Sequence, residues 1–392
     1  MPPVSRVLPA AGVLAVAITA LAACGGGGTT PGATGGEGAA KSGANTLAVQ
    51  ATDTTCVPDK ASVPAGTLTI KVTNRASKAN EVHVLRADGR TIVSEREDIG
   101  PDSTVDDFTV ELAAGKYQLA CKPGMKGDGI RADLTVVGGP AAGAPADARL
   151  SAAVEDYKKY VAERVDDSLR KTRKFAAAVK KGDVAGAKAL YAPSRVGWES
   201  IEPVAESFGD IDAKVDLREA DLEKGDEWTG WHRLEKALWA EPETLKDERE
   251  YADRLVADLE DLRRRVPAAE ITPAKMAGGA KELLDEVAHI KIDGEEEFFS
   301  HTDLWNFKAN VDGARKVHEL LKPVLRDKRP ELAATLDAEF GRLQTVLAEY
   351  EEGDGYVSYE KINKDAAAKK RLQDAVNALA EPLSGLAAAV AQ

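Results

Sequence analysis

The sequence predicts a two-domain protein in which an all-β sandwich precedes an all-α helical bundle. Between residues 46 and 138 apolar and polar residues alternate with a period of two, most clearly at residues 67–74 and 107–112. Alternating runs separated by glycine-containing turns are typical of half-buried strands. After residue 150 apolar residues recur three and four positions apart, as at Val154, Tyr157 and Val161. This second period indicates helices that each bury one face.

The first 23 residues have the pattern of a lipoprotein signal peptide. Arg6 is followed by an uncharged apolar run that ends in Leu21, Ala22, Ala23 and Cys24. Such a run is too short for a stable membrane span, and a cysteine after Leu-Ala-Ala is typical of a lipidation site. We therefore expect lipidated Cys24 to anchor an exported protein to the cell membrane on its extracytoplasmic side, either periplasmic or at the cell surface.

Changes in composition divide the rest of the chain. Residues 24–45 are rich in Gly, Thr and Ala and are predicted to be a flexible tether. The β domain is predicted at residues 46–138, a Gly/Pro/Ala-rich linker at 139–149 and the helical domain at 150–392. Glycine and proline residues separate the predicted helices of this domain. The sequence has no short repeat of the kind that indicates a solenoid.

The charge balance is acidic, with a formal net charge of −13. An acidic surface repels the phosphates of nucleic acids, so no nucleic-acid partner is expected. The same balance suits a cation as ligand.

One run in the helical domain carries a candidate metal site. His232 and Glu235 lie three positions apart in an amphipathic segment at residues 230–239 and therefore share a helix face. An imidazole and a carboxylate on one face can both reach a cation held between helices. The alternative from spacing alone is a surface ion pair.

Two further segments supply carboxylates. Glu199, Glu202 and Glu206 are predicted to form one stripe beside apolar residues, and Asp303 adjoins a hydrophobic stretch at residues 304–307. Carboxylates that converge from three helices on one histidine form an oxygen-rich site, which suits iron or another hard-to-borderline cation better than copper. Each carboxylate taken singly also fits a solvated helix face.

Three motifs together resemble a known family. Gly-Trp-His-Arg-Leu-Glu at residues 230–235, Trp-Glu-Ser-Ile-Glu-Pro at 198–203 and His-Thr-Asp-Leu-Trp-Asn-Phe-Lys-Ala-Asn-Val-Asp-Gly-Ala at 301–314 are similar to the imelysin-like domain of EfeO, the extracytoplasmic component of the EfeUOB iron-uptake system. The resemblance implies that His232 and Glu235 are metal ligands. It also implies that Glu199 is a third ligand and Asp303 a fourth, with Glu202 as the alternative to Glu199.

The β domain resembles the cupredoxins at residues 56–58, 63–66, 72–74 and 115–121. A blue-copper site needs two histidines and a cysteine, but His83 is the single histidine of this domain. The cysteines could form a disulfide or bind metal as thiolates, and the resemblance implies a second metal site for copper or iron. The candidate residues are Cys56, Cys121, Glu81, His83, Glu97, Asp98 and Met125, with Glu95 as a further acidic neighbour.

The function predicted from these observations is a binding module and not an enzyme. It would capture iron, with copper or a second iron in the cupredoxin-like domain, and deliver it to an EfeU-like iron permease that works with an EfeB-like haem peroxidase. The alternatives are a copper-assisted ferroxidase and a metallopeptidase. Proteolysis on zinc is disfavoured because His232 is not part of a His-Glu-x-x-His motif.

Overall fold

The computed structural model describes residues 45–391 except 88, 90–91, 139–146, 223–224, 226 and 290. The predicted signal peptide, the lipidation site at Cys24 and nearly all of the predicted tether lie outside the described residues.

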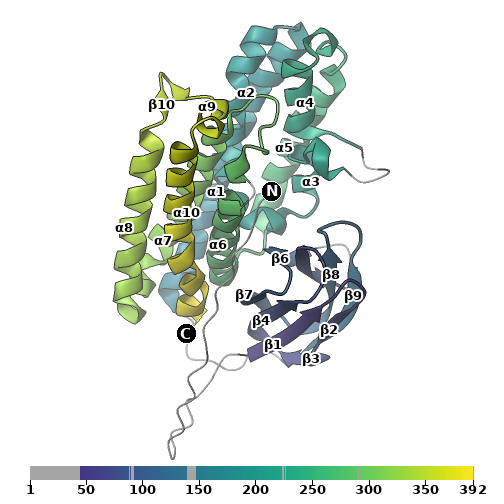
Figure 1. The fold of residues 1–392 in the computed structure, drawn as a ribbon, viewed down its shortest axis with the longest axis vertical. Coiled ribbons are helices and arrows are strands. Elements are labelled where there is room, and N and C mark those ends of the chain that lie inside the picture. Colours follow the sequence, from purple (N-terminus) through teal and green to yellow (C-terminus); the bar gives the residue numbers. More distant parts are fainter. Residues whose placement is uncertain are drawn as a thin grey trace, which may run out of the picture. The chain divides into compact units, whose positions relative to one another are not determined.

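The N-terminal domain is a sandwich of two sheets (Figure 1). The four-stranded sheet has the order β2 (Cys56–Pro58), β1 (Asn45–Ala51), β4 (Gly66–Asn74), β7 (Thr104–Leu112). The five-stranded sheet has the order β3 (Ser62–Pro64), β9 (Ile130–Val137), β8 (Gly115–Pro123), β5 (Asn80–Arg86), β6 (Ile92–Ile99).

The alternation in the sequence explains the core of this sandwich. In β4 the side chains of Leu68, Ile70 and Val72 are all fully buried, whereas the residues between them are less buried. Because successive side chains of a strand point to opposite faces, these three residues pack into the space between the sheets. Strand β5 differs, since six consecutive residues from Asn80 to Leu85 are buried on both faces. This double burial places two of its polar side chains, Glu81 and His83, away from water.

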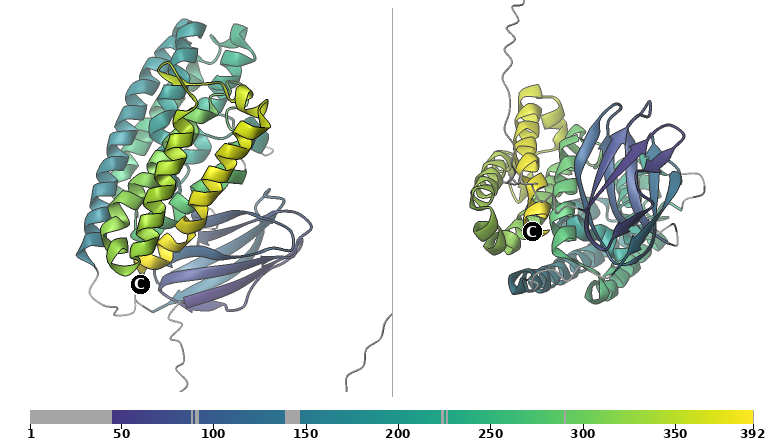
Figure 2. Two further views of the ribbon diagram at one scale, coloured as in Figure 1. Left: turned by 60° about the vertical axis from the view of Figure 1, so that its left-hand side comes forward. Right: turned by 90° about the horizontal axis from the view of Figure 1, so that it is seen from below.

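The C-terminal domain is helical (Figures 1 and 2). Its longer helices are α1 (Ala148–Lys181), α2 (Val184–Glu199), α4 (Gly230–Trp239), α5 (Arg249–Arg265), α6 (Pro273–His289), α7 (Asp303–Lys328), α8 (Pro330–Ala348) and α10 (Ala366–Ala391). Shorter helical segments are η1 (Glu202–Phe208), α3 (Ile211–Val215), η2 (Glu219–Asp221), η3 (Pro242–Thr244), η4 (Val266–Ala268), η5 (Lys291–Asp293) and α9 (Tyr359–Asn363). The predicted fold class, a β sandwich followed by a helical bundle, is confirmed.

Two segments differ from the sequence prediction. The glutamates at 199, 202 and 206 do not share one helix, because α2 ends at Glu199 and η1 begins at Glu202. Pro203 has no N–H group to donate to the carbonyl of Glu199, and the side chain of Asn310 donates to that carbonyl instead, at 3.1 Å. A short hairpin, β10 (Glu351–Glu352) and β11 (Gly355–Tyr356), precedes α9 where the sequence predicted only a break between helices. Within the described ranges, no helix has the length and apolar character that crossing a membrane requires.

Candidate metal centres

The histidine and glutamate of the predicted motif lie together inside the helical domain. His232 and Glu235 project from α4, with Nδ1 of His232 3.2 Å from Oε2 of Glu235. Their exposed fractions are 2% and 1%. The predicted shared face is therefore correct, and the surface ion pair considered as an alternative is not what forms.

Three carboxylates that the sequence did not single out complete the surroundings of His232. Its Nε2 lies 3.3 Å from Asp216 Oδ1 and 3.5 Å from Glu296 Oε1. Glu297 lies near both His232 and Glu235. Ligand atoms within 4.8 Å of one another occur in two sets, Asp216–His232–Glu296 and His232–Glu235–Glu297. One nitrogen among carboxylate oxygens is a donor set that suits iron or a similar divalent or trivalent cation.

A glycine allows Asp216 to reach this position. Gly230, the first residue of α4, has a φ of 86°, and a Cβ there would lie 2.3 Å from the carbonyl oxygen of Val215. Only glycine permits this conformation and this close approach without strain. The start of α4 can therefore lie against the end of α3, so that Asp216 and His232 become neighbours.

The loop after η5 brings the other two carboxylates. Glu235 holds this loop, because its Oε1 accepts hydrogen bonds from the backbone N–H groups of Phe299 at 3.0 Å and Ser300 at 2.7 Å. Asp303, at the start of α7, accepts the backbone N–H of Glu297 at 3.1 Å. Asp303 is thus buried beside the site, as expected, but it shapes the loop and does not belong to either set around His232.

A buried arginine balances part of this negative charge. Arg195, on α2, is fully buried, and its guanidinium group pairs with Glu199 and Asp216. The same group lies 2.7 Å from Glu297 and 3.5 Å from Glu296. A buried cation is tolerated only when it is paired in this way. Arg195 therefore offsets part of the negative charge of Glu199 and of three carboxylates beside the imidazole.

A buried lysine holds the two glutamates that were expected to bind metal. The Nζ of Lys291 lies 2.9 Å from Glu202, 3.7 Å from Glu199 and 3.6 Å from Glu286. Neither Glu199 nor Glu202 belongs to the sets around His232. Lys291 therefore contacts both of the expected ligands, and Arg195 also pairs with Glu199.

The pKa values of the cluster reflect burial and crowding. Burial and the neighbouring Glu202 raise the pKa of Glu199 to about 8. Burial raises the pKa of Glu297 to about 7, even though Arg195 opposes the shift. Burial and Arg195 would both lower the pKa of His232, but its contacts with Asp216, Glu235 and Glu296 raise it well above the ordinary value. The raised pKa values favour the protonated forms of Glu199, Glu297 and His232, so a cation that bound beside them would compete with protons.

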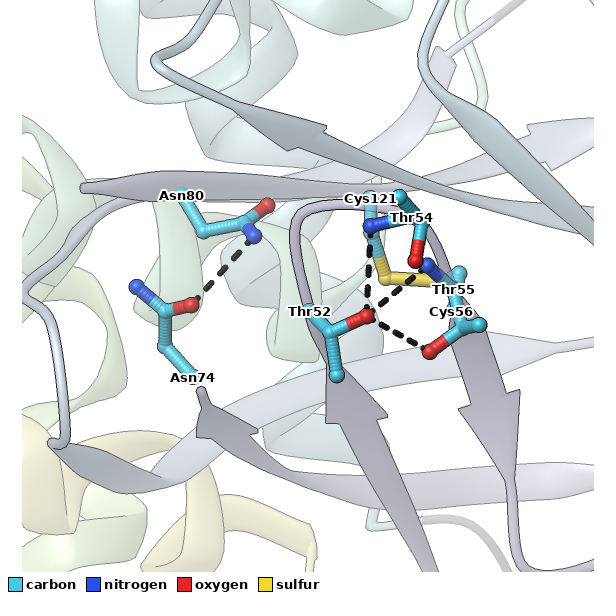
Figure 3. The surroundings of a disulfide bond; sticks show 7 residues. All are labelled: Thr52, Thr54, Thr55, Cys56, Asn74, Asn80 and Cys121. Carbon is cyan, nitrogen blue, oxygen red and sulfur yellow. Dashed lines mark hydrogen bonds between the residues drawn. A yellow bond between two sulfur atoms is a disulfide. The ribbon is translucent and has the colours of Figure 1, made fainter. Parts of the chain in front are cut away.

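The two cysteines of the β domain form a disulfide. Cys56 on β2 and Cys121 on β8 are bonded, with 5.5 Å between their Cα atoms (Figure 3). In the turn before Cys56, the side-chain oxygen of Thr52 accepts the backbone N–H groups of Thr54 at 3.2 Å and Thr55 at 2.9 Å. Of the two possibilities that the sequence left open, the structure has the disulfide and not a pair of thiolate ligands.

We expect this disulfide to stabilise the protein substantially. A covalent link across a separation of 65 residues restricts the unfolded chain, which corresponds to about 4 kcal/mol. The double variant Cys56→Ala and Cys121→Ala should lose stability of this order in the unfolding transition of the β domain, measured by urea denaturation. The wild-type protein should show no free thiol at these two positions after denaturation, and two reactive thiols there would contradict the prediction.

A second cluster remains in the β domain. His83 Nε2 contacts Glu81 and lies 2.9 Å from Glu95, and Lys122 lies 3.0 Å from Glu81. The sequence placed Glu81 and His83 on one face of one strand, and this is confirmed, since both belong to the same set of potential ligands with Glu95. The register between β5 and β6 places Glu95 next to His83, because these two residues are paired across the strands.

The remaining candidates of the β domain lie outside that cluster. Asp98 adopts a φ of 53° where the pairing of β5 with β6 shifts register, and Met125 adopts a φ of 55° in the turn after β8. Burial and the nearby Glu95 raise the pKa of Glu97 well above its usual range. None of the three belongs to the set formed by Glu81, His83 and Glu95.

Comparisons with known proteins cover both domains. A family model described as imelysin, of peptidase family M75, matches residues 153–386, and one described as a cupredoxin-like domain matches residues 14–136. An iron uptake system component EfeO of Escherichia coli O157:H7 is 41% identical over 344 residues, which are 86% of this chain and 89% of that protein. EfeO of Escherichia coli K12 is 40% identical over the same shares.

A solved structure supports the fold of the helical domain. A protein of Parabacteroides distasonis, described as an iron-regulated protein A precursor, superimposes with a TM-score of 0.53 and 15% identity. The match covers 64% of this chain and 97% of the other. At this level of identity the likeness concerns the fold alone.

Proposed function

This chain belongs to the imelysin family and to the EfeO iron uptake components, and we propose from that membership that it binds iron outside the cytoplasm and delivers it to a membrane iron permease. The chain shares 41% identity with a protein named for iron uptake, over 86% of its length. This membership supports a role in iron uptake. Iron capture, its delivery to a permease and the binding sites are proposed here in addition to that role.

The observation that carries the proposal is the buried imidazole of His232 among carboxylates from separate parts of the helical domain. Asp216, Glu235, Glu296 and Glu297 all lie around it, and none is more than 9% exposed. Concentrating this much negative charge in the interior is unfavourable unless a cation balances it. Iron accepts both carboxylate oxygens and an imidazole nitrogen, so it fits this donor set. Glu199, Glu202 and Asp303 border the cluster and are proposed to join or support it once iron is bound.

The β domain would hold a second cation at Glu81, His83 and Glu95. Its donors are one nitrogen and carboxylate oxygens, because the cysteine sulfurs are joined in a disulfide. Blue-copper chemistry depends on a thiolate, so this donor set favours a second iron over a copper centre of that kind.

The setting of the protein follows from its sequence and family. We propose that lipidation at Cys24 holds it on the outer face of the membrane, where an EfeU-like permease accepts the iron and an EfeB-like haem peroxidase acts in the same system. The protein itself is proposed to be a binding protein. Although its helical domain matches a family model named after a peptidase, His232 lacks the second histidine of a zinc peptidase motif.

Iron binding to the whole mature chain tests the proposal. Equilibrium dialysis against Fe²⁺ without oxygen, with metal analysis of the protein, should show bound iron at pH 7.5. Affinity should fall as pH falls toward 6, because the raised pKa values of His232, Glu199 and Glu297 mean that iron must displace protons. Each proton displaced corresponds to about a tenfold loss of affinity per pH unit below the relevant pKa. Absence of bound iron at pH 7.5 would refute the proposal, and an affinity independent of pH would contradict the site.

A further inference from the structure

A hollow lies between the long helices α7 and α8, which run side by side (Figures 1 and 2). Its volume is about 160 Å³, and its lining includes His318 and Lys322 from α7 and Asp337 and Phe340 from α8. None of these residues belongs to the sets of potential metal ligands found in the described part of the chain. An engineered apolar cavity of about 150 Å³ binds benzene, so the hollow is large enough for a small ring compound.

A glycine keeps the hollow open to solvent. Gly341 lines the hollow in the middle of α8 and is exposed, and a Cβ built on it would meet no neighbouring side chain within 4 Å. Glycine is a poor helix former, so its presence here does not favour the helix. Any other residue at this position would place a side chain at the mouth of the hollow.

Two buried rings form the floor of the hollow. His318 and Phe340 are 2% and 3% exposed, and their rings stack with centroids 5.5 Å apart. Nε2 of His318 lies 2.9 Å from Oδ1 of Asp337. Its Nδ1 is buried and has no hydrogen-bond partner among the residues that the structure describes. A buried polar atom without a partner is costly, so the floor favours a ligand that supplies one.

The contact with Asp337 decides which nitrogen of His318 carries the proton. Although burial opposes the shift, hydrogen bonds from Lys322 and His318 lower the pKa of Asp337, so its carboxyl group is ionised and can only accept. Nε2 of His318 therefore donates to it. Burial also lowers the pKa of His318, which keeps the ring neutral at pH 7. The lone pair of Nδ1 is consequently an acceptor that lacks a donor.

The charged side chains around the hollow balance one another. Nε of Arg315 lies 2.9 Å from Glu319, and its Nη1 donates to Gln344 at 2.7 Å. Nζ of Lys322 lies 2.6 Å from Asp337. Each cation thus has a carboxylate partner, and the lining carries no excess charge that would attract an ion. An uncharged ligand fits this lining best.

We propose that the hollow between α7 and α8 binds a small uncharged ring compound whose hydroxyl group donates a hydrogen bond to Nδ1 of His318. The ring of the ligand replaces water against the apolar surface of Phe340, and the hydroxyl group supplies the donor that Nδ1 lacks. Phenol is the smallest compound that has both features. This binding site is independent of the proposed iron sites.

Titration of the mature, chelator-treated protein with phenol and with benzene tests the proposal, with ligand-observed nuclear magnetic resonance as the readout. Phenol should bind with a Kd of about 1 mM, as expected for a ligand of so few atoms. Benzene has the same ring but no donor, so it should bind about fivefold more weakly, the scale of one hydrogen bond. Equal affinities would overturn the assigned hydrogen bond. Binding of neither compound would show that the hollow holds only water and would overturn the site.

Two variants locate the binding. His318→Phe keeps a ring of similar size but removes the acceptor, so phenol should then bind no more tightly than benzene. Gly341→Leu places a side chain at the mouth of the hollow and should weaken phenol binding about tenfold or more. Leucine is a better helix former than glycine, so this variant should remain folded, which circular dichroism verifies for both. Unchanged phenol binding in the two folded variants would overturn the proposal.

Discussion

Replacing His232 with alanine is expected to weaken iron binding to the helical domain at least about tenfold, the scale on which losing even a supporting residue of a metal site is felt. His232 is the only nitrogen donor in either set of potential ligands around it. The remaining oxygens are negatively charged and mutually repulsive, so without the imidazole they hold a cation less specifically. Calorimetric titration of the mature protein with Fe²⁺, in the absence of oxygen, measures the change.

His318→Ala is the matched control for this experiment. His318 is also buried in the helical domain, at 2% exposure, where it stacks on Phe340 and contacts Asp337 at 2.9 Å. It does not belong to the sets of potential ligands around His232. Its removal should cost stability but leave the iron affinity within about twofold. If both variants bind iron as the wild type does, His232 is not part of an iron site.

Replacing Arg195 with methionine is expected to destabilise the metal-free protein by about 3–5 kcal/mol, the usual consequence of removing one partner from a buried ion pair. The guanidinium group contacts Glu199, Asp216, Glu296 and Glu297 and offsets part of their charge in the interior of the domain. Without it these carboxylates must either take up protons or repel one another. Urea denaturation of the chelator-treated protein measures the free energy of unfolding.

Arg173→Met is the control for Arg195. The Arg173 side chain is 53% exposed and pairs with Glu260 at 2.7 Å on the surface of the same domain. Exposed ion pairs contribute about 1 kcal/mol or less, so this variant should unfold almost as the wild type does. An Arg195 variant no less stable than the Arg173 variant would show that the buried charges are not balanced in the way described.

The sequence predicted those parts of the candidate metal centres that depend on local spacing. His232 and Glu235 are three residues apart on one helix, and Glu81 and His83 are two apart on one strand, so the helical and strand periods place each pair on one face. Asp216, Glu296 and Glu297 come from irregular segments between helices. No periodic pattern marks such positions, and only the folding of the chain brings them to His232.

Two of the expected ligands pair with buried cations that the sequence argument did not consider. Glu199 contacts Arg195 and Lys291, and Glu202 contacts Lys291. Arg195 precedes Glu199 by four residues on α2, which is the spacing of a helical ion pair, so this competitor was detectable in the sequence. Lys291 was not detectable, because it follows α6, more than 80 residues away from the glutamates that it pairs with.

In the β domain, too, local sequence patterns predicted the strands but not the contacts between distant residues. Alternation and turn residues were sufficient to predict a sandwich, and the separation of Cys56 from Cys121 was compatible with either a disulfide or a metal site. Cys56 lies on β2 of the four-stranded sheet and Cys121 on β8 of the five-stranded sheet, so the packing of the two sheets brings the sulfurs within bonding distance. The packing of two sheets depends on the whole domain and is not contained in the spacing of the cysteines.

The central claim is that iron binds beside His232, and locating the metal in crystals of the iron-loaded mature protein tests it most directly. Anomalous diffraction recorded on either side of the iron absorption edge identifies the position of iron independently of any assumed ligand. We expect a peak of iron within bonding distance of His232, among the carboxylates that surround it. Iron-loaded crystals with no peak at His232, whether iron appears at another site or nowhere, would contradict the account.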